Sequence, residues 1–180
     1  HSDRLNKSGF SISVDYIGPY EPDVDGFKYA LVGVEIASSK GFVGLHTDRT
    51  AAQGLESLKQ FESNLKQASS GPNKNVLEFH HDDDKSFRGA VAAYALERGW
   101  KDTHTGGYDP NCNSVAERRI GMLQQLFRVV LLVSTGGVLY YNQLWDVGLK
   151  YCNYIINTQA WPDRPSPIST LSGFPNKRSK

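Results

Sequence analysis

The chain has 180 residues, a length that suits one domain with a sizeable core and leaves little room for a second. Hydrophobic residues make up 39% of it, which excludes a disordered chain, and no apolar run approaches the roughly 18 residues of a membrane-spanning helix. Lysine and arginine number 20 against 19 for aspartate and glutamate, so the net charge of +1 gives no general sign of nucleic-acid binding.

The chain opens on His1 without an initiator methionine or a signal-peptide pattern. We therefore interpret it as a single domain, residues 1–180 with a core over about 8–176, excised from a longer protein. Its two cysteines, Cys112 and Cys152, are too few for a disulfide framework and lack the spacing of a metal site. We expect reduced thiols in an intracellular protein that is not secreted and does not enter a membrane.

Three short strands are predicted at the start of the chain. Residues Phe10 to Ile17 alternate apolar and polar side chains in the manner of a half-buried strand. Two further β-rich runs follow, over Tyr29 to Ile36 and over Gly41 to Thr47. Tight turns separate the three runs, so we expect them to form a meander.

Helices and strands then alternate. Thr50 and Gln53 form a capping-box pattern at the start of a helix that ends near Ala68. The next elements are a strand, a helix and a strand, over 76–80, 86–98 and 100–104. A Gly- and Pro-containing loop over 105–113 leads to two amphipathic helices, near 114–134 and 140–158, which Gly136-Gly137 separates, and to a Pro-rich tail. This order favours an α+β layered domain built on one mixed sheet.

Three acidic residues are candidates for a catalytic site. Asp15 lies inside the first strand, opposite in phase to its apolar positions, where propensity disfavours an aspartate, although a surface position would also explain it. Asp82 follows the fourth strand, where a turn residue or a helix cap is the simpler reading. Glu117 ends Ser114-Val-Ala-Glu117, a capping box that accounts for it locally.

Taken together, the three carboxylates suit metal-dependent phosphoryl transfer. Carboxylates and substrate phosphate oxygens hold Mg²⁺, and two such ions can clamp the attacking and leaving oxygens of an in-line displacement. A central strand, the end of a neighbouring strand and the first turn of a covering helix can bring three carboxylates to one end of a sheet.

Four segments of the chain carry motifs: Val14-Asp-Tyr-Ile-Gly-Pro19, His80-His-Asp-Asp-Asp-Lys-Ser-Phe87, Tyr108-Asp-Pro-Asn-Cys-Asn-Ser-Val-Ala-Glu-Arg118 and Pro167-Ile-Ser-Thr-Leu-Ser-Gly-Phe-Pro175. In this order they resemble the catalytic cores of retroviral and long-terminal-repeat retrotransposon integrases. The separation of Asp82 from Glu117 is also close to that of the family. The resemblance covers nearly the whole chain, and its third segment is the most specific.

The resemblance implies a ribonuclease H-like fold, with a mixed five-stranded sheet flanked by helices, cut from a polyprotein. It implies that Asp15 ligates two Mg²⁺ or Mn²⁺ ions, Asp82 one of them and Glu117 the other. The implied reactions are trimming of element DNA ends and joining of the new 3′-hydroxyl to target DNA. The implied partners are DNA and further copies of the chain, as a homodimer or higher oligomer, with action in the nucleus.

Residues around the triad give further expectations. Helical spacing places Gln124 and Arg128 on the same stripe as Glu117, and these two with Arg118 are the predicted DNA contacts. An ordinary solvated helix face is the alternative. Gly106-Gly107 is expected to loosen the loop before Glu117.

Several histidines and aromatic residues have simpler explanations than a functional one. His80 and His81 flank Asp82 and could bind a metal, but strand-end packing is favoured. Trp145, Tyr151 and Tyr154 have helical spacing and are expected in the core or at an interface rather than as a base-stacking platform.

The chain departs from the family's pattern around the triad. Asp83-Asp84 replaces the usual Asn-Gly, Ser114 replaces a glycine, Ile120-Gly121 replaces a polar pair, and Glu35 stands where aspartate is usual. Three adjacent carboxylates also repel one another. A catalytically decayed or domesticated nucleic-acid- or protein-binding module on the same fold is therefore an alternative, as is a related nuclease or transposase.

Overall fold

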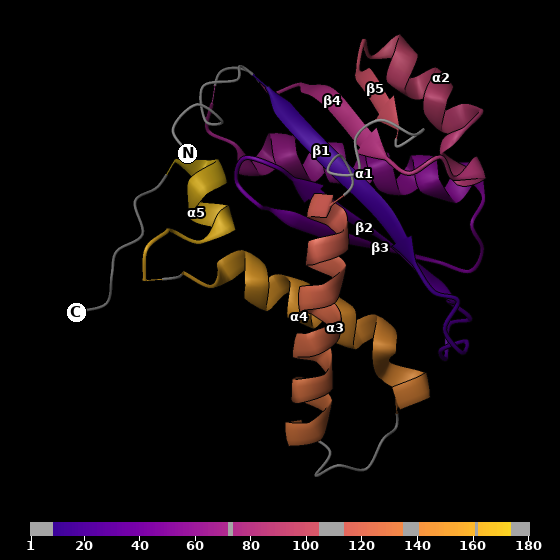
Figure 1. Ribbon diagram of the computed structural model, residues 1–180, viewed down its shortest axis with the longest axis vertical. Helices are drawn as coiled ribbons and strands as arrows, with labels where there is room; N and C mark the ends of the chain where they lie inside the picture. The colour runs from indigo at the N-terminus through magenta and orange to yellow at the C-terminus, as the bar shows by residue number, and fades with distance from the viewer. Residues whose placement is uncertain (1–8, 72–73, 105–113, 135–140, 161, 174–180) are drawn as a thin grey trace.

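A five-stranded mixed sheet organises the computed structural model, which describes residues 9–71, 74–104, 114–134, 141–160 and 162–173 (Figure 1). The strands are β1 (Phe10–Ile17), β2 (Tyr29–Glu35), β3 (Gly41–His46), β4 (Val76–His81) and β5 (Lys101–His104). Their order is β3-β2-β1-β4-β5. The first three pair antiparallel as the predicted meander, whereas β4 and β5 join the sheet in parallel with β1. The α+β prediction with one mixed sheet is confirmed.

Helices cover both faces of this sheet (Figure 1). Helices α1 (Ala51–Ala68) and α2 (Ala90–Glu97) pack on one face, and α3 (Ser114–Ser134) and α4 (Tyr141–Thr158) pack on the other. The short helix α5 (Pro167–Ser172) contacts α4 and α1. The central strand β1 is therefore enclosed between two layers of helices.

Alternation along β1 divides the core into two clusters. Ile12 and Val14 point toward α1 and α2, where they join a cluster that includes Phe61 and Phe79. The opposite face of the sheet packs against α3 and α4, with Leu123, Phe127, Leu131, Trp145, Leu149, Cys152 and Ile156 as the helical contribution. Because strand side chains alternate between faces, Asp15 belongs to the α3 face.

The predicted helix over 86–98 is wrong at its start. Residues Lys85–Phe87 form a 3₁₀ turn, η2, because the Asp84 carboxylate accepts a hydrogen bond from the Ser86 amide at 2.8 Å. Gly89 then adopts a φ of 63°, a left-handed conformation that ends the turn, and α2 begins only at Ala90.

The predicted Pro-rich tail contains helix α5. The Ser166 hydroxyl accepts from the Ser169 amide at 3.2 Å, Pro167 occupies the first turn, and Gly173 ends the helix with a φ of 69°. The predicted loop over 105–113, Gly136-Gly137 and both ends of the predicted core lie outside the described residues. Within the described ranges, no helix has the length and apolar content needed to cross a membrane.

Candidate active site

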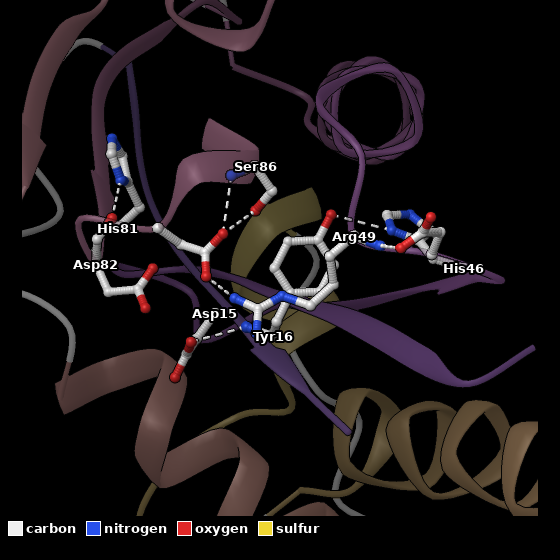
Figure 2. Close-up of polar contacts among 9 residues, drawn as sticks. Asp15, Tyr16, His46, Arg49, His81, Asp82 and Ser86 are labelled. Atoms are coloured by element: carbon white, nitrogen blue, oxygen red, sulfur yellow. Dashed lines mark hydrogen bonds and ion pairs between the residues drawn. The ribbon is translucent and has the colours of Figure 1, made fainter. Parts of the chain in front are cut away.

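The pairing of β1 with β4 brings the first two predicted carboxylates to the same end of the sheet. Ser13 pairs with His80, so continuing the parallel register by two residues places Asp15 beside Asp82. Helix α3 crosses β1 on the face to which Asp15 points, with Glu117 in the first turn of that helix. Figure 2 shows the Asp15 and Asp82 side chains in this region.

Asp15 is half-buried, and the charged groups around it shift its pKa. The pKa of Asp15 is raised to about 6, chiefly by burial and to a lesser extent by the negative charges of Asp82 and Glu117. The Tyr16 amide, which donates to Asp15 Oδ1 at 2.7 Å, and the charge of Arg49 lower this pKa. The three carboxylates predicted from separate motifs therefore share one electrostatic neighbourhood.

Asp82 has an oxygen that no protein donor satisfies. Burial raises the pKa of Asp82, while the nearby Arg49 and His81 lower it. Its Oδ1 atom is buried and has no hydrogen-bond partner among the described residues. The residue that caps the following turn is Asp84, so Asp82 is not needed as a cap. Because a buried acceptor without a donor is costly, and Mg²⁺ prefers oxygen ligands, Asp82 has the chemistry of a metal ligand.

Glu117 is the exposed member of the acidic set. Its side chain is exposed, and α3 begins only three residues before it, at Ser114. In the described ranges, no three His, Cys, Asp or Glu side chains are arranged to hold a metal ion. The donor chemistry of Asp15 and Asp82 thus fits a divalent cation, while a three-ligand geometry is not assembled.

A positive charge that the sequence analysis missed lies beside the two aspartates. Arg49, in the connection between β3 and α1, forms an ion pair with Asp84. Its guanidinium carbon lies 5.1 Å from the centroid of the Tyr16 ring. A single arginine in a turn has no periodicity or motif that would have singled it out.

Tyr16 is itself held by a buried hydrogen-bonded pair (Figure 2). Its hydroxyl lies 3.0 Å from His46 Nδ1, and His46 Nε2 lies 2.7 Å from the Ser57 hydroxyl. Burial lowers the pKa of His46 to about 4, so the ring is neutral at physiological pH. Gly54 leaves room for this arrangement, since a Cβ there would lie 3.1 Å from the Tyr16 hydroxyl.

The two histidines before Asp82 do not form a pair. His81 packs against the Phe79 and Phe87 rings, at centroid distances of 4.7 and 4.9 Å, and its Nε2 lies 2.8 Å from Asp102. His80 points to the other face of β4 and contacts Thr103. The favoured packing role is confirmed for His81.

The three predicted DNA contacts lie on α3 with different surroundings. Arg118 is exposed and donates to the Ser114 carbonyl at 3.0 Å, one turn earlier. Gln124 is half-buried and donates to the Tyr20 hydroxyl at 3.3 Å. Arg128 is exposed. Their contact with DNA stays a prediction.

A buried arginine on α3 was also missed. Arg119 donates through Nη2 to Asn153 at 2.6 Å and to Asn157 at 2.7 Å, and burial lowers its pKa to about 10. Both asparagine side chains also donate to the Gly41 carbonyl, which ties α3, α4 and β3 together. The signal was available, because Arg119 shares the helical face of the buried residues Ala116 and Leu123.

The other residues named from the sequence have structural roles or lie at the surface. Trp145 is buried and donates to the Glu21 carbonyl at 3.0 Å, which confirms its place in the core, whereas Tyr151 and Tyr154 are exposed. Glu35 is buried and accepts hydrogen bonds from the amide and hydroxyl of Ser38. Glu35 therefore fixes the turn between β2 and β3.

Solved structures similar to this chain exist, although its sequence matches no protein-family model and no curated protein. The crystal structure of the BIV integrase catalytic core domain matches with a TM-score of 0.63 and 16% identity, over 89% of this chain and 91% of that one. The chain has the fold of an integrase catalytic core. The ribonuclease H-like fold implied by the motifs is thereby confirmed.

Two further integrase structures agree. The HTLV-2 integrase catalytic core, solved with magnesium in a trimeric form, matches with a TM-score of 0.62 and 16% identity, over 91% of this chain and 95% of that one. A simian T-cell lymphotropic virus intasome, in complex with PP2A regulatory subunit B56 gamma, matches with a TM-score of 0.66 and 14% identity. That match covers 94% of this chain, which spans 55% of the simian virus chain.

Proposed function

We propose that this chain is the catalytic core of an integrase, a metal-dependent polynucleotidyl transferase that trims element DNA ends and joins them to target DNA. One observation carries the proposal. The charges of Asp82 and Glu117 both act on Asp15, although Asp15 lies in β1, Asp82 directly after β4 and Glu117 in α3. The integrase-core fold supports the same reading.

The acidic residues would hold two Mg²⁺ or Mn²⁺ ions. Asp15 would ligate both ions, Asp82 one of them through its unpartnered buried oxygen, and Glu117 the other. When bound, such ions supply charge neutralisation for an in-line displacement at phosphorus. The half-buried position of Asp15 limits competition from water, and the backbone hydrogen bond from Tyr16 fixes its carboxylate.

The DNA backbone would lie along α3. The exposed Arg118 and Arg128 supply positive charge to phosphates, and Gln124 supplies an amide on the same stripe as Glu117. Positioning and charge do the catalytic work, so no covalent intermediate with the protein forms.

The proposal includes assembly and location. The chain would act as a homodimer or higher oligomer on element ends and target DNA, inside the cell and in the nucleus at the time of action. Oligomerisation is supported by the exposed apolar side chains of the last two long helices, Val129, Leu132, Val133, Leu144, Val147, Tyr151 and Tyr154.

A second candidate function has a specific observation behind it. No three-ligand metal group is assembled in the described ranges, and Asp84, in place of the family's glycine, is engaged by Arg49. A decayed or domesticated module that binds nucleic acid or protein on this fold would have these features without turnover. A related nuclease or transposase is the other enzymatic alternative.

Strand transfer of a labelled duplex oligonucleotide, with Mn²⁺ or Mg²⁺, tests the proposal. A branched substrate is included so that the reverse reaction can also be seen. We expect Asp82→Asn and Glu117→Gln each to reduce the rate by at least about 100-fold, the usual cost of losing one preorganised charged group. Asp83→Asn is the matched control, because Asp83 is exposed and pairs with Arg88 at 2.9 Å, and it should keep the parent rate.

The decisive contrary outcome is a folded parent chain that is inert and shows no carboxylate-dependent metal binding by calorimetry. The binding-module function would then replace the enzyme.

A further inference from the structure

Arg49 places a fixed positive charge within electrostatic reach of both aspartates. It forms an ion pair with Asp84, two residues after Asp82, and its guanidinium carbon lies 5.1 Å from the ring centroid of Tyr16, the residue after Asp15. A cation so placed does for these carboxylates part of what a bound metal ion would do, since either one offsets the repulsion between buried negative charges. The position of Arg49 therefore bears directly on how strongly the site attracts an ion.

Contacts on two sides restrain the Arg49 side chain. On one side it pairs with Asp84, whose carboxylate also accepts from the amide and hydroxyl of Ser86, at 2.8 and 2.6 Å. On the other side the guanidinium lies over the Tyr16 ring, which His46 holds in turn. Figure 2 shows this guanidinium between the Tyr16 ring and the carboxyl groups.

Arg49 is not fully satisfied by these contacts. Its Nε atom is buried and has no hydrogen-bond partner among the described residues. The side chain is thus held by its ion pair with Asp84 and by its cation–π contact with the Tyr16 ring more than by a complete set of hydrogen bonds.

We propose that Arg49 is a built-in counter-ion of the candidate active site, which balances Asp15 and Asp82 in the absence of a divalent cation and weakens the binding of such a cation. The inference rests on the proposed function, because it supposes that these aspartates take a metal ion. The physical cause is repulsion between the guanidinium and the incoming cation, together with competition for the same carboxylates. Asp84 sets the strength of the effect by holding Arg49 in place.

Isothermal titration of the 180-residue chain with MnCl₂ tests the inference without any measurement of activity. We expect Arg49→Gln to bind Mn²⁺ roughly three- to tenfold more tightly than the parent, the size expected for removing one partly screened charge nearby. Arg49→Lys, which keeps the charge, should stay within about twofold of the parent. Arg88→Gln is the matched control, because Arg88 pairs with Asp83 next to the same turn but is exposed, and it should leave the affinity unchanged.

The outcomes separate this inference from the proposed function. Saturable binding by the parent, lost in Asp82→Asn, with equal or weaker affinity in Arg49→Gln would overturn the counter-ion role and leave the metal site standing. The same holds if Arg49→Lys matches Arg49→Gln, since the charge would not then be the cause. Thermal melting without metal verifies that each variant is folded. No saturable binding by the parent would remove the proposed metal site and the inference together.

Discussion

Asp82, Asp83 and Asp84 are adjacent in the sequence and yet have three different environments. Asp82 has a buried oxygen without a donor, Asp83 is exposed with Arg88, and Asp84 caps η2 and pairs with Arg49. The repulsion expected of three neighbouring carboxylates is reduced because two of them have their own arginine. Asp83 and Asp84, which stand where integrases usually have Asn-Gly, thus each have an arginine partner within this chain.

Protonation of His46 makes the stability of the folded chain depend on pH. Its ordinary pKa of 6.5 is lowered to about 4 in the folded chain by burial, so the folded state binds fewer protons between these values. The stability that His46 contributes is fully present above pH 6.5 and is lost as the pH falls toward 4. The loss should amount to about 2 to 3 kcal/mol.

We expect His46→Gln to abolish that part of the pH dependence. Urea denaturation above pH 6.5 and near pH 4 should show the parent losing more stability than the variant. Ser57→Ala is the control, because it removes the 2.7 Å contact to Nε2 but leaves the titrating ring, and should keep the parent's pH dependence. Equal losses in the parent and His46→Gln would contradict the assignment.

At the scale of elements, a glycine of α4, Gly148, packs against the Phe127 ring of α3. A Cβ on Gly148 would lie 1.9 Å from the Phe127 ring, a contact that cannot exist unless the ring or one of the helices moves. Gly121, on α3, has nothing within 4 Å of such a Cβ. Packing therefore requires a glycine at position 148 but not at position 121.

Alanine at these two positions should change stability in opposite directions. Gly148→Ala overpacks the core and should lower the free energy of unfolding by about 1 to 3 kcal/mol. Gly121→Ala should raise it by up to about 1 kcal/mol, because alanine favours the helix. Urea denaturation of both variants gives the comparison, and a neutral Gly148→Ala would contradict the tight packing of Gly148 against the Phe127 ring.

The sequence predicts an element well when neighbouring residues alone determine it. The strands and the long helices follow from periodicity, which adjacent residues encode. The start of α2 was misplaced because a side chain two positions away, Asp84, competes for the Ser86 amide, and because Gly89 breaks the helical conformation. Helix α5 was missed because six residues give too short a pattern, although Ser166-Pro167 is a recognisable start.

At the scale of the whole molecule, the outer face of α4 carries an apolar stripe. Leu144, Val147, Tyr151 and Tyr154 repeat at three- and four-residue spacing and are 47% to 63% exposed. The opposite face of the same helix packs on the sheet through Trp145 and Leu149. One helix thus offers a second apolar surface to another molecule.

We expect this stripe to contribute to self-association under the proposed function. Val147→Glu should weaken the oligomer by about tenfold or more, since it removes apolar burial and adds a charge to the contact. Gln159→Glu, an exposed change just beyond the end of α4, should behave like the parent. Sedimentation velocity over a range of concentrations measures both, and an unchanged Val147→Glu would exclude the stripe from the interface.

The candidate site was predictable only in part. Its carboxylates belong to motifs, and a motif is a sequence pattern, so Asp15, Asp82 and Glu117 could be proposed from the chain alone. Arg49 could not, because its role depends on the fold, which sets Asp84 and the Tyr16 ring around it. Charges that act across a site from outside its motifs become visible only with the tertiary structure.

Strand β1 lies between β2, which follows it closely in the sequence, and β4, which is synthesised much later. This order affects folding during synthesis on the ribosome. Its edge toward β2 can pair once residue 35 has emerged, whereas its edge toward β4 waits for residues 76–81. Until then β1 presents unpaired N–H and C=O groups on which a neighbouring nascent chain can add a strand. Rare codons between residues 47 and 76 would lengthen this interval, and the yield of folded protein would fall as ribosomes crowd on the messenger RNA.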